Sequence, residues 1–252
     1  LNTAIVAYWQ KDHVNQDGYV SQLPGLMDFP MNNAVIQGLK NPDAGSGWLT
    51  MYENLANDFQ FAHPEKLVVF PDNHDMSRFY TQLGENSDLM KLGVAYYATT
   101  RGIPQLFYGT EILMSNPGPK EDGIIRSDFP GGWPGDKVNA YTGEGLSEKQ
   151  KQAQDYVRKL LNWRRHCAAV HSGALKHFVP ADGIYVYFRY NDSGKVMVIL
   201  NKNSEPRSLD TSRFSEIMGS CTSGTEIISG KTITNLKNLE VPAMEAMIIE
   251  LK

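Results

Sequence analysis

The chain has 252 residues, enough for one or two domains with a sizeable hydrophobic core. Hydrophobic residues make up 41% and charged residues 21%, and the formal net charge of −4 gives no electrostatic reason to expect nucleic acid or an anionic membrane surface as partner. No stretch approaches the roughly 18 uninterrupted apolar residues that a membrane-spanning helix requires.

The chain begins with Leu1 and shows no basic-then-apolar leader, so we expect processing or truncation to have removed what came before. Two cysteines, Cys167 and Cys221, do not make a disulfide framework in a chain of this length. Cys167 is predicted to be a reduced packing thiol on a buried helix. The six histidines show no metal-ligand spacing. The cysteines do not indicate in which cellular compartment the protein resides.

The first two-thirds of the chain alternate strand-like and helix-like segments. Residues 25–30, GLMDFP, form an apolar run closed by a proline, which predicts a buried strand. Helices are predicted over residues 31–39 and 48–59. The apolar residues at helical spacing in the second helix are Leu49, Tyr52, Leu55, Ala56 and Phe59.

Residues 66–70, KLVVF, are the clearest buried strand, because a continuous β-branched run is typical of parallel strands. This strand leads directly into the polar cluster 72–75, DNHD. A helix is predicted over residues 88–100, with Gly102 after its end. The next strand is predicted over residues 103–108, IPQLFY.

The segment 115–145 has no hydrophobic periodicity and is rich in Gly, Pro, Asp and Asn. With about 30 residues it exceeds an ordinary connection, and long loops inside compact domains are usually functional. Ser147 and Gln150 then predict a capping box that begins a long helix.

The last third of the chain is nearly all strand-like. Residues 184–190 and 195–201 flank the turn sequence NDSG and predict a hairpin, and residues 244–251 predict a final strand. The change of pattern near 172–173 predicts two domains, an α/β domain over 1–172 and an antiparallel β domain over 173–252.

Two polar segments follow successive strands, FPDNHDMSR over 70–78 and GIPQLFYGTE over 102–111. Alone, the first is more often a helix N-cap and turn, and the second a buried strand with a glycine turn. In parallel α/β folds, however, ligand sites form at the carboxyl ends of strands, which is where these residues lie.

The pair FPDNHD and GIPQLFYGTE resembles the last two barrel strands of the α-amylase family of glycoside hydrolases. The segments AYWQKD (7–12), LMDFP (26–30) and SDFPGGWPGDKVNAYTGEG (127–145) are similar to its neopullulanase and cyclomaltodextrinase branch. The segment NWRRHCAAVHSGAL (162–175) resembles the junction to that family's C-terminal β domain. The resemblance implies an α/β fold, the C-terminal portion of a (β/α)8 barrel (about strands 6–8) followed by a small antiparallel β-sandwich domain.

The chemistry implied by the resemblance is retaining hydrolysis of α-glucosidic bonds in starch, pullulan or cyclomaltodextrin. Such enzymes use a carboxylate nucleophile and a carboxylic acid about 5 Å apart. The resemblance makes Asp75 a third carboxylate, which stabilises the transition state. The implied substrate-binding residues are His74, Arg78, Tyr108 and Trp133. For Trp133, an aromatic plug between loop and barrel is an equal alternative.

The nucleophile and the acid/base glutamate of the family precede AYWQKD, so neither position is present, and Glu111 receives a structural place only. We therefore expect a fragment that is inactive alone. A three-stranded slice leaves strand edges unpaired, which predicts association with the missing N-terminal barrel half or self-association through the exposed edge.

Several alternatives stay open. The chain could be a non-catalytic amylase-like carbohydrate-binding or interaction module, and Asp72, His74 and Asp75 could hold a metal ion. Asp128 and Asp136 are either solvated loop charges or ion ligands. The resemblance requires no cofactor or metal and leaves calcium undetermined. The expected partner is an α-glucan, with no nucleic acid and no membrane, and a periplasmic or secreted bacterial enzyme is favoured over a cytoplasmic one.

Overall fold

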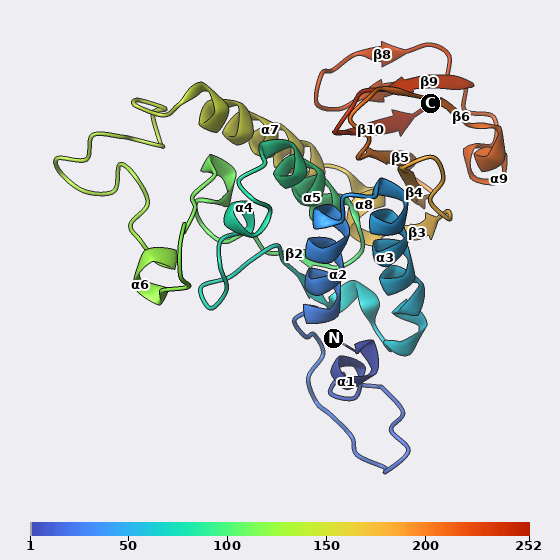
Figure 1. The fold of residues 1–252 in the computed structure, drawn as a ribbon. Coiled ribbons are helices and arrows are strands. Elements are labelled where there is room, and N and C mark those ends of the chain that lie inside the picture. The colour runs from blue at the N-terminus through green and yellow to red at the C-terminus, as the bar shows by residue number, and fades with distance from the viewer. Residues whose placement is uncertain (1) are drawn as a thin grey trace.

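The computed structural model describes residues 2–252. Figure 1 shows a mainly helical part, coloured blue to yellow, and an antiparallel β part in orange and red. The α-helices are α1 (Thr3–Ala7), α2 (Phe29–Lys40), α3 (Ala44–Ala56), α4 (Phe79–Gln82), α5 (Ser87–Thr99), α6 (Asp122–Ile125), α7 (Glu148–Arg164), α8 (Ala168–Ser172) and α9 (Ser215–Met218). Short 3-10 helices lie at Asn57–Gln60, Pro64–Lys66, Thr110–Ile112 and Ser212–Phe214. No helix of the described residues is long and apolar enough to span a membrane.

Three segments of the first part run side by side as parallel strands. β1 (Val68–Val69) pairs with β2 (Ile103–Pro104), and Met27 forms a parallel bridge to Val68 on the other side. Helix α2 follows Met27, and helices α4 and α5 follow β1. This alternation is the predicted slice of a parallel barrel. The outer strand is open to solvent, since Ile103 is 55% exposed.

Three predicted strands of the first part are shorter in the structure. The strand predicted over 66–70 is reduced to β1, and Lys66 belongs to the preceding 3-10 helix. The strand predicted over 25–30 contributes only Met27, because the Asp28 carboxylate accepts a hydrogen bond from the Met31 amide at 2.9 Å and begins α2 at Phe29. The strand predicted over 103–108 pairs only through Ile103 and Pro104, and proline offers no amide hydrogen to a further ladder.

Helix α3 begins at Ala44, four residues before its predicted start, and ends at Ala56, three residues before its predicted end. Trp48, Met51 and Leu55 are buried, whereas Leu49 and Phe59 are exposed. The close contact with α2 decides this orientation. A Cβ added to Gly47 would lie 2.3 Å from the Gly38 carbonyl oxygen, so only this face can lie against α2.

The β part contains a six-stranded sheet of order β3-β4-β5-β10-β7-β8 and a pair, β6-β9. Its strands are β3 (Ala174–His177), β4 (Ile184–Asn191), β5 (Gly194–Asn201), β6 (Arg207–Asp210), β7 (Gly224–Glu226), β8 (Thr232–Ile233), β9 (Asn238–Val241) and β10 (Glu245–Leu251). The β4–β5 hairpin closes at Asn191 and Gly194, so the predicted hairpin is confirmed. The sheet packs on the helices in one core that includes Tyr96, Tyr187 and Ile248.

Two cations of the β part cap helices of the first part. Arg189 donates to the carbonyl oxygens of Thr99 (3.2 Å) and Thr100 (2.5 Å) at the end of α5. Lys202 donates to the carbonyl oxygens of Gly38 and Asn41, both at 2.6 Å, at the end of α2. Since helix C-termini carry unpaired carbonyl groups and partial negative charge, these contacts tie the two parts together.

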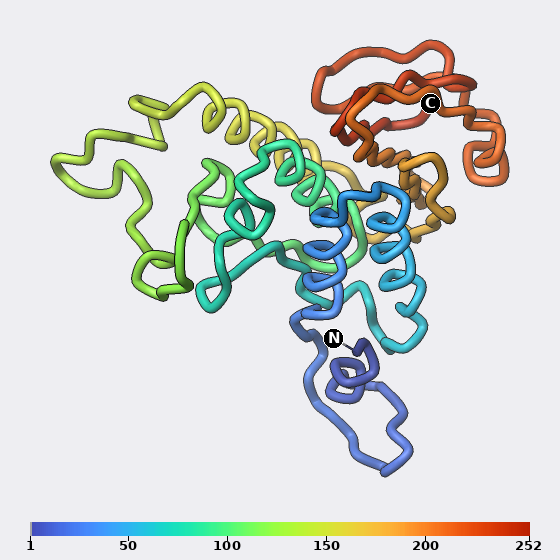
Figure 2. The backbone as a smooth tube through the Cα atoms, viewed as in Figure 1, coloured from blue at the N-terminus to red at the C-terminus, as the bar shows by residue number. Residues whose placement is uncertain are grey.

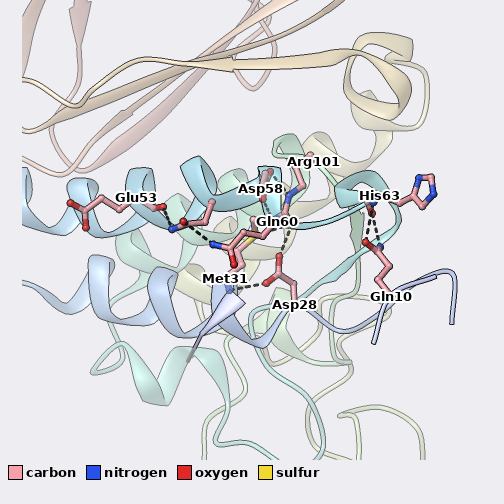
Figure 3. A network of polar contacts seen from close by, with 9 residues as sticks. Gln10, Asp28, Met31, Glu53, Asp58, Gln60, His63 and Arg101 are labelled. Atoms are coloured by element: carbon pink, nitrogen blue, oxygen red, sulfur yellow. Dashed lines mark hydrogen bonds and ion pairs between the residues drawn. The ribbon is translucent and has the colours of Figure 1, made fainter. Parts of the chain in front are cut away.

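Arg101, Asp28 and Asp58 form a largely buried ion cluster (Figure 3). The Arg101 guanidinium contacts the Asp28 carboxylate at 2.6 Å and also pairs with Asp58. Burial lowers the pKa of Arg101, but the two carboxylates outweigh this and raise it. The cluster therefore joins the start of α2, the 3-10 helix Asn57–Gln60 after α3 and the approach to β2 by charged hydrogen bonds.

Local signals in the second half are confirmed. Ser147 and Gln150 form the predicted capping box at the start of α7. Cys167 is a free, buried thiol, as predicted, although it lies at the N-cap of α8 rather than within a helix. Figure 2 shows two long connections leaving the body, one between α1 and α2 and one from α6 to α7.

Candidate active site

Asp72 anchors the polar cluster that follows β1. Its carboxylate is fully buried and accepts hydrogen bonds from the Phe79 amide at 2.6 Å and from the Thr110 hydroxyl at 3.2 Å. Burial raises the pKa of Asp72 to about 6. Asp72 therefore joins the ends of the two strand segments and does not face a ligand.

His74 and Asp75 project outward from the turn beyond Asp72. Their side chains are 63% and 66% exposed, and the His74 Nε2 atom lies 3.4 Å from an Asp75 carboxylate oxygen. The Asn73 side chain accepts a hydrogen bond from the Asp75 amide at 2.9 Å, which fixes the turn. The imidazole and the carboxylate thus lie together at the carboxyl end of a parallel strand, on the solvent side.

Arg78 is 1% exposed, which contradicts the predicted contact with substrate. Its Nε donates to the Ile125 carbonyl oxygen at 2.9 Å, and its Nη1 donates to the Tyr108 carbonyl oxygen. The guanidinium also stacks on Phe107, with 4.2 Å from Cζ to the ring centroid. Desolvation lowers the pKa of Arg78, partly offset by Asp72. Arg78 therefore fixes the backbone of the site at Ile125 and Tyr108.

Tyr108 lies at the end of the second strand segment and is partly exposed. Its hydroxyl donates to the Ser127 carbonyl oxygen at 2.8 Å, so the ring lies under the long loop. Gly109 follows with a φ of +86°, and a Cβ there would lie 2.1 Å from the Met114 sulfur. Only glycine fits this turn, which directs the chain back over the strand ends.

Sequence reasoning missed Arg126. Its Nη2 lies 3.0 Å from an Asp75 carboxylate oxygen and 3.0 Å from an Asp122 carboxylate oxygen. Its Nε donates to the His74 carbonyl oxygen at 2.9 Å. The only local signal was the i, i+4 spacing of Asp122 and Arg126 in an otherwise aperiodic segment.

Trp133 is 63% exposed. The Asp136 carboxylate accepts hydrogen bonds from the Trp133 amide at 3.1 Å and from the Gly131 amide at 2.8 Å. Asp136 thus organises the turn that presents the indole to solvent.

The alternative metal site at Asp72, His74 and Asp75 finds no support. Asp72 is buried and hydrogen-bonded inward, whereas His74 and Asp75 are exposed. Within residues 2–252, no group of three or more His, Cys, Asp or Glu side chains is arranged to hold a metal ion.

The family model described as "Alpha amylase, catalytic domain" matches residues 8–196. The chain belongs to the α-amylase family. A second model, "Cyclo-malto-dextrinase C-terminal domain", matches residues 175–250. The family and the fold class expected from the two strand-end motifs are therefore confirmed.

Relatives within the α-amylase family are bacterial and distant. A cyclomaltodextrin glucanotransferase of Thermoanaerobacterium thermosulfurigenes is 25% identical over 80% of this chain and 27% of its own length. Alpha-amylase 3 of Dictyoglomus thermophilum is 28% identical over 73% of this chain and 40% of its own length. This α-amylase-family chain thus spans well under half the length of these curated relatives.

Solved structures show the same fold. The α-amylase of Geobacillus thermoleovorans, crystallised with acarbose, has a TM-score of 0.73 and 22% identity, covering 91% of this chain and 48% of its own. AmyP in complex with maltose has a TM-score of 0.74 and 18% identity, covering 96% and 52%. The α-amylase-family architecture therefore extends over nearly all of the chain.

Proposed function

We propose that this chain is the C-terminal part of a retaining α-glucan hydrolase and supplies the carboxylate that stabilises the transition state, Asp75. One observation carries the proposal. The Asp75 carboxylate is exposed at the carboxyl end of a parallel barrel strand, next to His74 and on the same side as Tyr108. Sites in barrels of this type form at that end of the strands.

The chemistry proposed for Asp75 follows from its charge and exposure. In retaining hydrolysis the sugar passes through an oxocarbenium-like transition state. A carboxylate that accepts hydrogen bonds from sugar hydroxyls beside the reacting carbon binds more strongly as positive charge develops, so it lowers the barrier. His74, adjacent and exposed, is proposed to donate to the same sugar.

The nucleophile and the acid/base are proposed to come from barrel strands outside this chain. Two observations support this partner. The chain covers about half of the related solved enzymes, and Ile103 on the outer strand β2 is exposed. A barrel half that adds parallel strands here would cover it. On its own the chain is expected to be inactive.

The test uses a longer polypeptide that carries the complete catalytic domain with this chain at its C-terminus. We expect it to release reducing sugar from pullulan, starch or cyclomaltodextrin, and Asp75→Asn to lower kcat by about 100- to 1,000-fold. Asp155→Asn, at an exposed carboxylate on α7, is the matched control and should keep full activity. A complete polypeptide that binds maltooligosaccharides without cleaving them would refute the proposal in favour of a binding module.

A further inference from the structure

Three consecutive residues of the long loop, 125–127, are each attached to the candidate site. The Ile125 carbonyl accepts from Arg78, the Arg126 side chain reaches Asp75, and the Ser127 carbonyl accepts from Tyr108. Asp75 and Arg78 follow β1, whereas Tyr108 follows β2, so the loop bridges both strand ends. The loop is therefore docked on the site residues themselves.

Within this docked segment, only Arg126 contacts Asp75 through its side chain. Its guanidinium holds the Asp75 carboxylate at 3.0 Å and the His74 carbonyl oxygen at 2.9 Å, so it grips both the side chain and the backbone of one turn. The Asp122 carboxylate contacts the same Nη2 atom at 3.0 Å, so the guanidinium is held by a second carboxylate as well. A planar guanidinium with several fixed donors restricts the rotation of the carboxylate it binds.

We propose that Arg126 is a positioning residue, which orients the Asp75 carboxylate and docks the loop over it. The catalytic part of this inference rests on the proposed function, whereas the docking part does not. Arg126 acts through Asp75 rather than on the reacting bond. Exposed ion pairs contribute little to folding stability, so its effect is expected on geometry and rate rather than on the fold.

The consequence for rate follows from the precision that such sites need. A displacement of about 1 Å in a positioned group can cost about 100-fold in rate. The pair is accessible to water in this chain, and a bound sugar that displaces this water would strengthen it. Arg126 would then matter most in the complex with substrate.

The docking part is tested by hydrogen exchange in the 252-residue chain. The amides of Ile125, Arg126 and Ser127 are hydrogen-bonded within the segment and report its opening. We expect Arg126→Gln to accelerate their exchange about two- to fivefold. Arg158→Gln, at an exposed arginine paired with Asp155 on α7, is the matched control and should change nothing there. Unchanged exchange in Arg126→Gln would overturn the docking role.

The positioning part is tested in the longer polypeptide with its complete catalytic domain. Arg126→Gln should lower kcat by about 10- to 100-fold with a smaller change in KM, and Arg126→Lys should recover part of the loss. In an Asp75→Asn background, Arg126→Gln should cause little further loss. Equal losses in both backgrounds, or an unchanged kcat, would overturn the positioning role. A wild-type polypeptide that cleaves no glucan would refute both the proposed function and the positioning role. The docking role would still be decided by the hydrogen-exchange experiment on the 252-residue chain.

Discussion

The Nζ atom of Lys202 lies 2.6 Å from the carbonyl oxygen of Gly38, and this contact joins the β part to the end of helix α2. Burial lowers the pKa of Lys202 to about 8, from an ordinary value of 10.5. Between these two pH values the unfolded chain binds more protons at this residue than the folded chain does. The free energy of unfolding should therefore rise with pH across this window.

We expect this rise to be about 1–3 kcal/mol larger in the wild type than in Lys202→Met, which has no group to titrate at this position. The measurement is urea unfolding of both proteins at pH 7.5 and pH 10.5. Lys40→Met, at an exposed lysine near the same end of α2, controls for the loss of a charge. Parallel pH dependences of wild type and Lys202→Met would contradict the prediction.

Arg101 should be the most sensitive charged residue of the fold. Arg101→Met leaves the Asp28 and Asp58 carboxylates without their cation, and an unpaired buried charge costs about 3–5 kcal/mol. Denaturant unfolding should show this loss. Combining Arg101→Met with Asp28→Asn and Asp58→Asn should restore part of the stability, because the stranded charges are then removed. A loss below about 1 kcal/mol in the single variant would show that the cluster is not a stabilising element.

The buried Asp72 carboxyl should also make the free energy of unfolding depend on pH, but with the opposite sign to Lys202. Its folded-state pKa of about 6 lies above the ordinary value of 3.8, so the folded chain holds more protons between these values and loses stability as pH rises through them. Asp72→Asn keeps an oxygen that accepts from Phe79 and removes the buried charge.

We therefore expect Asp72→Asn to raise the unfolding free energy by about 1–3 kcal/mol at pH 7 and to change it little at pH 3.5. Urea titrations at the two pH values provide the test. Asp128→Asn, at an exposed loop carboxylate, should be neutral at both. Destabilisation by Asp72→Asn at pH 7 would mean that the ionised carboxylate is preferred by the fold.

Trp133 offers an exposed indole on the loop that is docked at the site. If it stacks on a glucan, Trp133→Ala should weaken maltooligosaccharide binding by about tenfold, or about 1.4 kcal/mol, in the longer polypeptide. Calorimetry measures this directly. Phe59→Ala removes another exposed aromatic, 81% exposed, from the segment that follows α3 and should leave affinity unchanged. Equal affinities for wild type and Trp133→Ala would remove Trp133 from the binding surface.

Sequence reasoning was most successful where the determinants are local. The capping box of Ser147 and Gln150 spans four residues, and the hairpin at 191–194 depends on its own turn, so both were predicted correctly. The parallel slice was predicted from strand-end motifs in their order along the chain. The face of α3 that is buried could not be predicted in the same way, because the contact of Gly47 with Gly38 selects it, and this packing has no signature within α3 itself.

The site was predicted only in part, for the same reason. His74 and Asp75 lie within one motif, and the turn that exposes them is made by neighbouring residues. Arg78 was assigned to the substrate only because the resemblance implied it, and its burial depends on contacts that the motif does not contain. Its actual partner, Ile125, is 47 positions away, and the Asp75 contact of Arg126 spans 51 positions. Such contacts arise from the path of the long loop, which follows no periodic pattern.

The most direct test of the proposed role of Asp75 is a crystal structure of the longer polypeptide with bound acarbose. We expect an Asp75 carboxylate oxygen within about 3 Å of a hydroxyl of the sugar ring at the cleavage site, with Arg126 still on the other oxygen. A sugar ring at the cleavage site that lies beyond hydrogen-bond reach of Asp75 would contradict it.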